Sequence, residues 1–459
     1  MPRTEHDLLG DIAVPDEALW GAHTQRALAN FAPTGRRLPR GLIRAFALVK
    51  KAAALVNGEL GFLPGEVAAA LAAAGDELAA GDLDGQIVVD PLAGGAGTSL
   101  NMNVNEVLAN RAGELLGEPR GAYRRVHPLD TVNLHQSTND VFPTAVRLAA
   151  LWGLADLEAA IVELQVALQD KEREFADVVM VGRTQLQDAV PLTAGQLFGA
   201  WAEACARDRW RIFKCLERLK VVNLGGTAIG TGIGAPRRYI FRVIEKLREL
   251  SNLPLSRAEN PVEATTNQDT TVEADGILTA LAANLLKIAT DLRLLSSSPV
   301  AELRLPPVQA GSSIMPGKVN PVIPEYAAQL ALEAIAGHEA LTAAVAAGNL
   351  QLSQYFPLAA WHLLDHLHLL NIAVAALAQK CVRGIAVDET RCRANLDGSL
   401  AIAAALVPVI GYEKAQAAVR LAQEKQLPLR EALSVLGVAA ADIDEALSPA
   451  KLRRLGNRE

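Results

Sequence analysis

The most constraining feature of the sequence is the length of its helical apolar periods. Apolar residues recur at helical spacing, with few β-branched or aromatic runs, in the segments 41–60, 142–176, 191–220, 270–298, 325–347 and 357–384. Several of these segments far exceed the roughly 12-residue average helix, and helices of about thirty residues occur mainly in bundles and coiled coils. We therefore expect a mainly α fold built around a central bundle of long helices.

The sequence also suggests how the rest of the chain is divided. Residues 1–135 are expected to form an N-terminal cap domain with a short hairpin near Gly10–Trp20, and residues 136–395 the central long-helix bundle. Residues 396–459 are expected to form a small helical C-terminal domain, in which two amphipathic segments are separated at Pro428. Three domains agree with a length of 459 residues at about 150 residues per domain.

Charge and hydropathy exclude several classes of partner. The chain has 44 Lys and Arg against 51 Asp and Glu, a net charge of −7, so no basic surplus favours nucleic acid or an anionic membrane. Apolar runs such as Leu400–Val407 are interrupted well before the ~18 residues that a spanning helix needs. The N-terminus has no signal-peptide apolar core, and we expect a cytoplasmic protein.

Cysteine and histidine spacing does not predict a metal site. No zinc-like spacing joins the four cysteines, which we interpret as reduced structural residues: Cys205, Cys215, Cys381 and Cys392. His362 and His366 would share a helix face, but Asp365 stands where the inverted zinc motif has Glu. The Leu-rich surroundings favour hydrogen-bonded imidazoles on a partly buried helix.

Five polar loops between the helices carry the chemistry. They lie at 94–103, 127–140, 182–191, 225–236 and 309–321. Their hydroxyls, amides and one cation are Thr98, Ser99, Ser137, Thr138, Asn139, Thr184, Gln185, Ser312, Ser313, Lys318 and Asn320. A single Ser or Thr usually caps a helix or forms a turn. Together the five loops indicate a site for a small dicarboxylate, which needs many neutral donors and a positive charge.

The loop at Gly311–Pro321, with the sequence GSSIMPGKVNP, resembles the signature loop of the aspartase/fumarase superfamily. Four further segments agree in order and spacing: GGAGTSLNMNVNEVLANRA, HPLDTVNLHQSTNDVFPT, GRTQLQDAVPLTAGQ and NLGGTAIGTG. The resemblance runs from about Leu8 into the C-terminal region. It implies a three-domain fold, a homotetramer whose central helices join in one bundle, and active sites shared between three subunits. The substrate would be a small dicarboxylate or amino acid, and no metal or organic cofactor is implied.

The resemblance also implies roles for individual residues. Ser312 would be the base that removes a proton beside a carboxylate, with Lys318 and backbone N–H groups stabilising its alkoxide. The resulting aci-carboxylate dianion needs preorganised donors, which would come from Thr98, Ser137, Thr138 and Ser313. The second carboxylate would be held by Lys318, Asn320 and Thr184. The remaining matched residues are Ser99, Asn139 and Gln185 near the substrate, Gly311 and Gly317 as flexible flanks of the loop, and Glu325 as a supporting residue.

Position 185 favours the aspartase branch of the family. Class II fumarases typically have GRTHTQDA where this chain has GRTQLQDA, and they pair that His with a Glu matching Glu325. Gln185 cannot titrate, so it cannot give a proton to a departing hydroxide, whereas the amino group of aspartate is already an ammonium at neutral pH. We therefore expect a carbon–nitrogen lyase that eliminates ammonia from L-aspartate to give fumarate.

Other segments keep alternatives open. The segments ALWGAHTQRALANF and NDVFPTA resemble class II fumarase sequences more closely. In GNLQLSQYFPLAAW, Ser353 replaces the usual Asn, and Tyr355 and Phe356 also depart from the family pattern. This segment favours a related ammonia-lyase acting on a modified aspartate. A catalytically silent structural or binding protein is disfavoured because Ser312 and Lys318 are both present.

Overall fold

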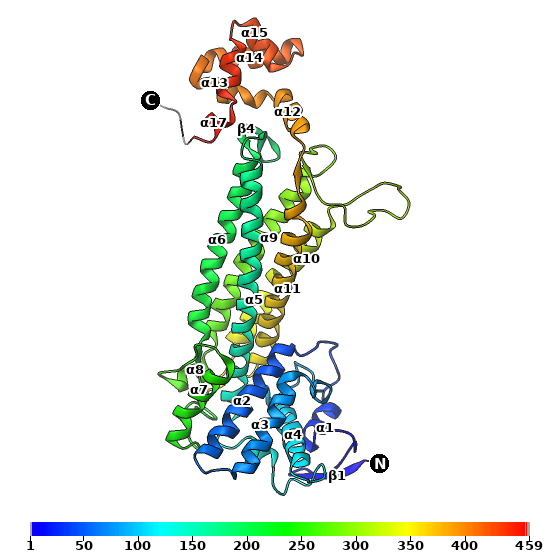
Figure 1. The fold of residues 1–459 in the computed structure, drawn as a ribbon, viewed down its shortest axis with the longest axis vertical. Coiled ribbons are helices and arrows are strands. Elements are labelled where there is room, and N and C mark those ends of the chain that lie inside the picture. The colour runs from blue at the N-terminus through cyan, green and yellow to red at the C-terminus, as the bar shows by residue number, and fades with distance from the viewer. Residues whose placement is uncertain (1, 455, 457–459) are drawn as a thin grey trace. The chain divides into compact units, whose positions relative to one another are not determined.

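The computed structural model describes residues 2–454 and 456. The chain is mainly helical (Figure 1) and forms two compact units. Unit 1 comprises the residues up to 157 together with 211–279 and 333–369, and unit 2 comprises 158–210, 280–332 and the residues from 370 onward. The three-domain division expected from the sequence, with boundaries near 135 and 395, stays a prediction.

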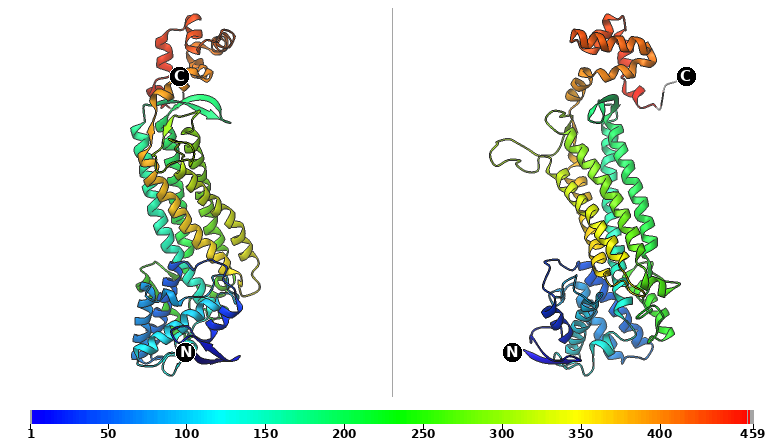
Figure 2. Two further views of the ribbon diagram at one scale, coloured as in Figure 1. Left: turned by 90° about the vertical axis from the view of Figure 1, so that its right-hand side faces the viewer. Right: turned by 180° about the vertical axis from the view of Figure 1, so that it is seen from behind.

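Five long helices form the bundle: α5 (Thr138–Glu174), α6 (Ala194–Leu219), α9 (Asp269–Leu295), α10 (Val322–Ala346) and α11 (Phe356–Lys380). The residues of each of these helices are divided between the two units. Within a unit these segments lie side by side (Figures 1 and 2). Leu154 in unit 1 and Ile161 and Leu164 in unit 2 are almost completely buried, as the apolar period requires. The long helices expected from the sequence are confirmed.

Unit 1 also contains the N-terminal elements. Its other helices are α1 (Ala22–Asn30), α2 (Arg40–Glu59), α3 (Gly65–Ala80), α4 (Thr98–Leu115), α7 (Arg237–Ser251) and α8 (Pro261–Thr266). Strands β1 (Arg3–Asp7) and β2 (Gly10–Val14) form an antiparallel hairpin, and β5 (Val221–Val222) pairs in parallel with β6 (Ser256–Arg257). The hairpin therefore lies earlier in the sequence than the Gly10–Trp20 region where we expected it. Its turn is at Leu8 and Leu9, where the Leu9 N–H donates to Asp7 Oδ1 over 2.9 Å.

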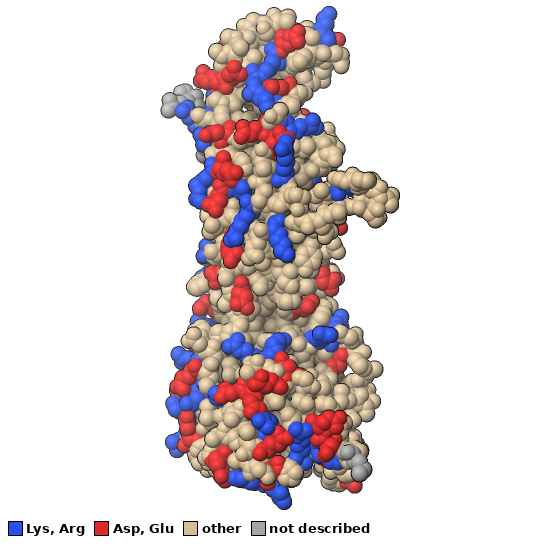
Figure 3. All heavy atoms as spheres, turned by 45° about the vertical axis from the view of Figure 1, so that its right-hand side comes forward, with Lys and Arg blue, Asp and Glu red and all other residues tan. Residues whose placement is uncertain are grey.

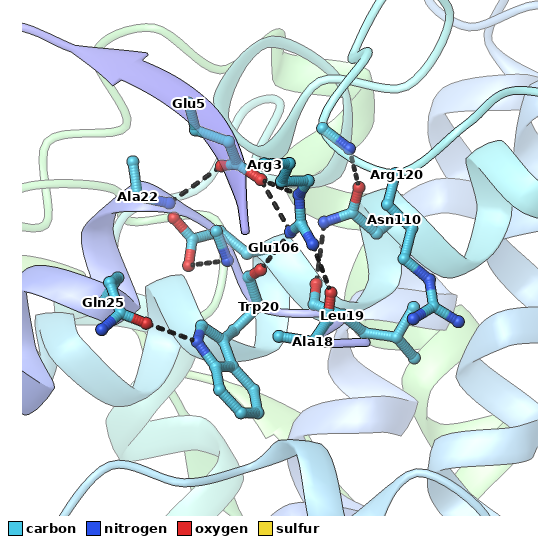
Figure 4. A network of polar contacts seen from close by, with 12 residues as sticks. Arg3, Glu5, Ala18, Leu19, Trp20, Ala22, Gln25, Glu106, Asn110 and Arg120 are labelled. Atoms are coloured by element: carbon cyan, nitrogen blue, oxygen red, sulfur yellow. Dashed lines mark hydrogen bonds and ion pairs between the residues drawn. The ribbon is translucent and has the colours of Figure 1, made fainter. Parts of the chain in front are cut away.

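Two buried carboxylates hold the start of α1 (Figure 4). The cap residue Gly21 has no side chain that could accept the first N–H groups of the helix. Glu106 of α4 accepts hydrogen bonds from the backbone N–H groups of Gly21, His23 and Thr24 over 2.8–3.1 Å. Glu5 of β1 accepts from the N–H of Ala22 over 2.9 Å and pairs with Arg3. The N-terminal hairpin is thereby tied to α1 and α4.

Unit 2 contains a hairpin of β3 (Val179–Thr184) and β4 (Gln187–Thr193), and a short pair of β7 (Leu303–Arg304) with β8 (Ala386–Val387). Its C-terminal helices are α12 (Glu389–Gly398), α13 (Ala403–Ile410), α14 (Tyr412–Lys425), α15 (Leu429–Val435), α16 (Ala440–Ala446) and α17 (Pro449–Leu452). They pack around a core that includes Leu406 and Leu433. Pro428 separates α14 from α15, as expected.

Among the described residues no single helix is long and apolar enough to cross a membrane, and the one helix pair that qualifies when combined, Glu389–Gly398 with Leu400–Ile410, is bent by 76°. All four cysteines are buried free thiols. His366 is buried on α11, and its Nδ1 lies 2.7 Å from Oδ1 of buried Asp275. This geometry confirms a hydrogen-bonded imidazole at that position.

Candidate active site

The loop of residues 309–321, called the serine loop below, is closed at its base by its own backbone. The Gly311 N–H donates to the Lys318 carbonyl over 2.7 Å, and Asn320 Nδ2 donates to the Gly311 carbonyl over 2.8 Å. A Cβ at position 311 would lie 2.8 Å from the Asn320 nitrogen and 2.9 Å from the Lys318 oxygen. Only glycine permits this close approach, and Gly317 supplies a positive φ of 79° near the other end.

Ser312 accepts two hydrogen bonds from the backbone of its own loop. Its Oγ accepts hydrogen bonds from the backbone N–H groups of Ile314, over 3.2 Å, and Met315, over 2.9 Å. Two N–H donors on one oxygen stabilise the alkoxide more than the neutral hydroxyl, which lowers the cost of losing the proton. The local turn thus gives the Ser312 Oγ two backbone N–H donors.

The serine loop projects from unit 2 as an extended arm (Figure 1). Its surface is almost uncharged (Figure 3), with Lys318 as the one charged residue between 305 and 321. Ile314 is 84% exposed and Val319 is 51% exposed. Exposed apolar residues on a projecting loop are typical of a segment that another surface covers.

The β3–β4 hairpin of unit 2 presents Thr184 and Gln185 at an exposed turn. Thr184 pairs with Gln187, and the two turn residues Gln185 and Leu186 have φ values of 55° and 62°. Such a turn normally requires Gly, Asn or Asp, because a positive φ is strained for other residues. A partly buried ion pair adjoins this turn: Arg183 contacts both oxygens of Glu302 over 2.6 and 2.9 Å, and Asn395 also donates to Glu302.

In unit 1, Thr98 opens α4 after three residues with positive φ, Gly95, Ala96 and Gly97. The hydroxyl of Ser99 donates to the Gly94 carbonyl over 3.2 Å, and its side chain is buried. Thr98 is partly exposed. The Ser99 hydroxyl therefore stabilises the turn before α4 by its contact with Gly94. Thr98 is the partly exposed residue of this turn.

The start of α5 is fixed by a buried carboxylate. Asp140 is fully buried and accepts from the backbone N–H groups of Ser137, Gly225 and Thr227 over 2.9–3.0 Å. Burial raises the pKa of Asp140 to about 6. Asp140 therefore joins the polar loop at 225–236 to the segment that carries Ser137, Thr138 and Asn139.

Asn139 makes two contacts with the segment 223–228, one through its side chain and one through its backbone carbonyl. Its side-chain Nδ2 donates to the Ala228 carbonyl over 2.8 Å, which leaves the Oδ1 atom as an acceptor. Pro143 has no N–H for the carbonyl four residues earlier, and Asn223 Nδ2 donates to that Asn139 carbonyl over 3.0 Å instead. The proline inside α5 thus leaves a carbonyl that Asn223, just before the 225–236 loop, contacts.

Thr138 and Asn139 line a small cleft of unit 1, with a volume of about 10 Å³, together with the unusual segment near 353. The cleft residues are Ala96, Thr138, Asn139, Phe142, Pro143, Thr265, Gln268, Leu352, Ser353 and Phe356. Ser353 Oγ and Gln268 Oε1 are buried and have no hydrogen-bond partner. Thr265 and Gln268, which the sequence did not single out, also line this cleft.

The predicted site residues divide between the two units. Unit 1 holds Thr98, Ser99, Ser137, Thr138 and Asn139. Unit 2 holds Thr184, Gln185, Gly311, Ser312, Ser313, Gly317, Lys318, Asn320 and Glu325. Glu325 lies exposed in the first turn of α10. Each unit brings its own set to loops and helix starts, and the joining of both sets in one active site stays a prediction.

Comparison with protein-family models decides the family. A model described as Lyase matches residues 10–336, and a model described as Fumarase C C-terminus matches residues 402–454. This chain belongs to the lyase family. It is an enzyme of the aspartase/fumarase superfamily, as the motifs of the five loops predicted.

Relatives of this lyase include both branches at similar identity. An aspartate ammonia-lyase of Pseudomonas aeruginosa is 46% identical over 92% of this chain and 90% of its own. A class II fumarate hydratase of Myxococcus xanthus is 44% identical over 96% of this chain and 95% of its own. The structure is similar, with a TM-score of 0.94 and 46% identity over 99% of both chains, to a fumarate lyase:delta crystallin from Brucella melitensis. The fold is confirmed, and overall identity does not separate the two activities.

Proposed function

We propose that this lyase is an aspartate ammonia-lyase, which reversibly eliminates ammonia from L-aspartate to give fumarate. The observation that carries the proposal is Gln185, on the β3–β4 turn. An amide can accept a hydrogen bond from an ammonium group but cannot deliver a proton to a departing hydroxide. Asn139 supports the same conclusion, because its Nδ2 is used by Ala228 and its Oδ1 is left to accept.

In the proposed mechanism Ser312 takes the proton from the carbon beside one carboxylate. The two N–H groups on its Oγ support the alkoxide that this step requires. Thr98, Ser137, Thr138 and Ser313 would stabilise the aci-carboxylate dianion, and Lys318, Asn320 and Thr184 would hold the other carboxylate. The C–N bond then breaks, and the amino group leaves as ammonia without a further proton donor.

We further propose that the active lyase is a homotetramer with shared sites. Large apolar side chains stay exposed on the helices of unit 2, with exposures of 48% for Val166, 51% for Leu332 and 43% for Tyr326. In a tetramer these faces would pack against other subunits. The same assembly would cover the serine loop.

A second candidate is a related ammonia-lyase that acts on a substituted aspartate. The specific observation is that Ser353 and Phe356, which depart from the family pattern, line one cleft with Thr138 and Asn139. Ser353 Oγ and Gln268 Oε1 are buried beside this cleft without a hydrogen-bond partner, and a polar substituent would satisfy them only if the side chains that bury them moved. A third candidate function is the hydration of fumarate, because a fumarate hydratase is among the relatives at similar identity.

Steady-state assays on a panel of substrates distinguish the three candidate functions. We expect kcat/KM for L-aspartate to exceed that for L-malate by at least about 10²-fold, on the scale of lost acid–base catalysis. Substituted aspartates should react more slowly than L-aspartate. Faster turnover of malate would show a hydratase, and turnover restricted to a bulkier aspartate would transfer the assignment to the second candidate.

A further inference from the structure

Lys50 of α2 is a buried cation close to the proposed substrate loop. Its side chain is 2% exposed, and its Nζ donates to Asn133 Oδ1 and to Gln136 Oε1, each over 3.0 Å. Burial lowers the pKa of Lys50 to about 7. Burying a positive charge costs free energy. No step of the proposed mechanism uses Lys50.

The ammonium fixes the direction of the hydrogen bonds around it. The charged ammonium has only donors, and the neutral amine still has two N–H groups for these two contacts, so the atom of Asn133 that faces Lys50 is the oxygen. The other side of the Asn133 amide agrees, because its Nδ2 donates to the Gln136 carbonyl over 3.2 Å. The oriented Asn133 Oδ1 also accepts from Asn101 Nδ2, over 3.3 Å, and Asn105 Nδ2, over 3.2 Å.

Asn101 links Asn133 to Thr138 through hydrogen bonds of fixed direction. With its Nδ2 turned to the Asn133 oxygen, the same Nδ2 donates to Thr138 Oγ1 over 3.1 Å. The Thr138 oxygen is therefore an acceptor on its inner side, and its own proton must point elsewhere. No described protein group accepts that proton, and Thr138 lines the cleft.

We propose that Lys50 is a positioning residue that acts through Asn133 and Asn101 to make Thr138 present its O–H proton to the substrate. The inference rests on the proposed function, in which Thr138 contacts the reacting carboxylate. A donor whose direction is fixed before the reaction needs no reorientation as the dianion forms, and this preorganisation is the main source of such stabilisation. Without Lys50, Asn133 and Asn101 can rotate, and Thr138 can turn its lone pairs to the carboxylate.

A double-mutant cycle tests the coupling. Lys50→Met should lower kcat by roughly 10²-fold, the scale of one lost oxyanion donor, with a smaller change in KM. In a Thr138→Val background, where the O–H no longer exists, the same replacement should change kcat by less than about twofold. A purely structural role of Lys50 predicts equal losses in both backgrounds, and that result would overturn the proposal.

A second pair of variants keeps the test valid if Lys50→Met does not fold. Asn101→Leu leaves the contacts of Lys50 with Asn133 and Gln136 in place but removes the donor to Thr138, so it should show the same dependence on Thr138. Asn105→Leu is the matched control, because Asn105 contacts the same Asn133 oxygen but not Thr138; its kcat should stay near wild type. A loss by Asn105→Leu equal to that of Asn101→Leu would contradict the direction argument.

The cycle is measured with whichever dicarboxylate the wild-type enzyme turns over. Inactivity of the wild type with L-aspartate but turnover of another substrate would refute the proposed function, and the cycle on that substrate would still decide the role of Lys50. Additive losses on an active substrate would refute the role of Lys50 alone.

Discussion

Ser312→Ala should lower kcat for aspartate by about 10³- to 10⁴-fold, the scale of losing a general base. The physical reason is that alanine leaves the N–H groups of Ile314 and Met315 in place but removes the oxygen that they stabilise. The serine loop keeps its closure, because Gly311, Lys318 and Asn320 are unchanged. Stopped assays at saturating substrate, with the melting temperature of each variant, measure the effect.

Ser298→Ala is the matched control. Ser298 is an exposed serine between α9 and β7, also in unit 2, and its replacement should leave kcat within about twofold of wild type and the melting temperature unchanged. Near-normal turnover by Ser312→Ala would show that another group is the base. A large fall in melting temperature would show that Ser312 acts on the loop instead.

Mixing two strongly impaired variants should restore activity. Thr138→Val removes a proposed donor in unit 1 and Ser312→Ala the proposed base in unit 2. If the two residues in each site come from different subunits, random hybrid tetramers carry about a quarter of their sites with both residues intact. We expect activity to rise from near zero toward that fraction after the variants are unfolded together and refolded.

Each variant refolded alone is the control for this experiment, since neither should gain activity. Full tetramers that form hybrids but stay inactive would show that Thr138 and Ser312 of one site belong to the same chain. Light scattering and mass measurement establish whether hybrids have formed.

The long helices could be predicted to within a few residues at most ends because packing determines them. The helical spacing of apolar residues such as Leu154 and Ile161 forms an apolar face, and this face must be buried against other helices. The N-terminal hairpin was placed wrongly because its turn at Leu8 and Leu9 contains neither Asn nor Gly at the two central positions. The turn at Gln185 and Leu186 has no glycine either, and the ion pair of Arg183 with Glu302 that adjoins it spans a long sequence separation.

The loops of the candidate site were recognisable from their hydroxyls and amides, but the function of each side chain within them was not. Ser99 and Thr98 are neighbours with the same chemistry, and only the contact with Gly94 shows that Ser99 points inward. The network below Thr138 joins α2 to α4 through Asn133. No local pattern marks such a network, because its members lie far apart in sequence and a buried lysine has no periodic signature.

The most direct test of the central claim is the reverse reaction of the purified enzyme. Fumarate is followed by its ultraviolet absorbance in two matched buffers, one with ammonium and one without it. We expect fumarate to disappear, with L-aspartate formed in equal amount, only when ammonium is present, because Gln185 cannot activate water. Consumption of fumarate at a similar rate without ammonium, with L-malate as the product, would contradict it.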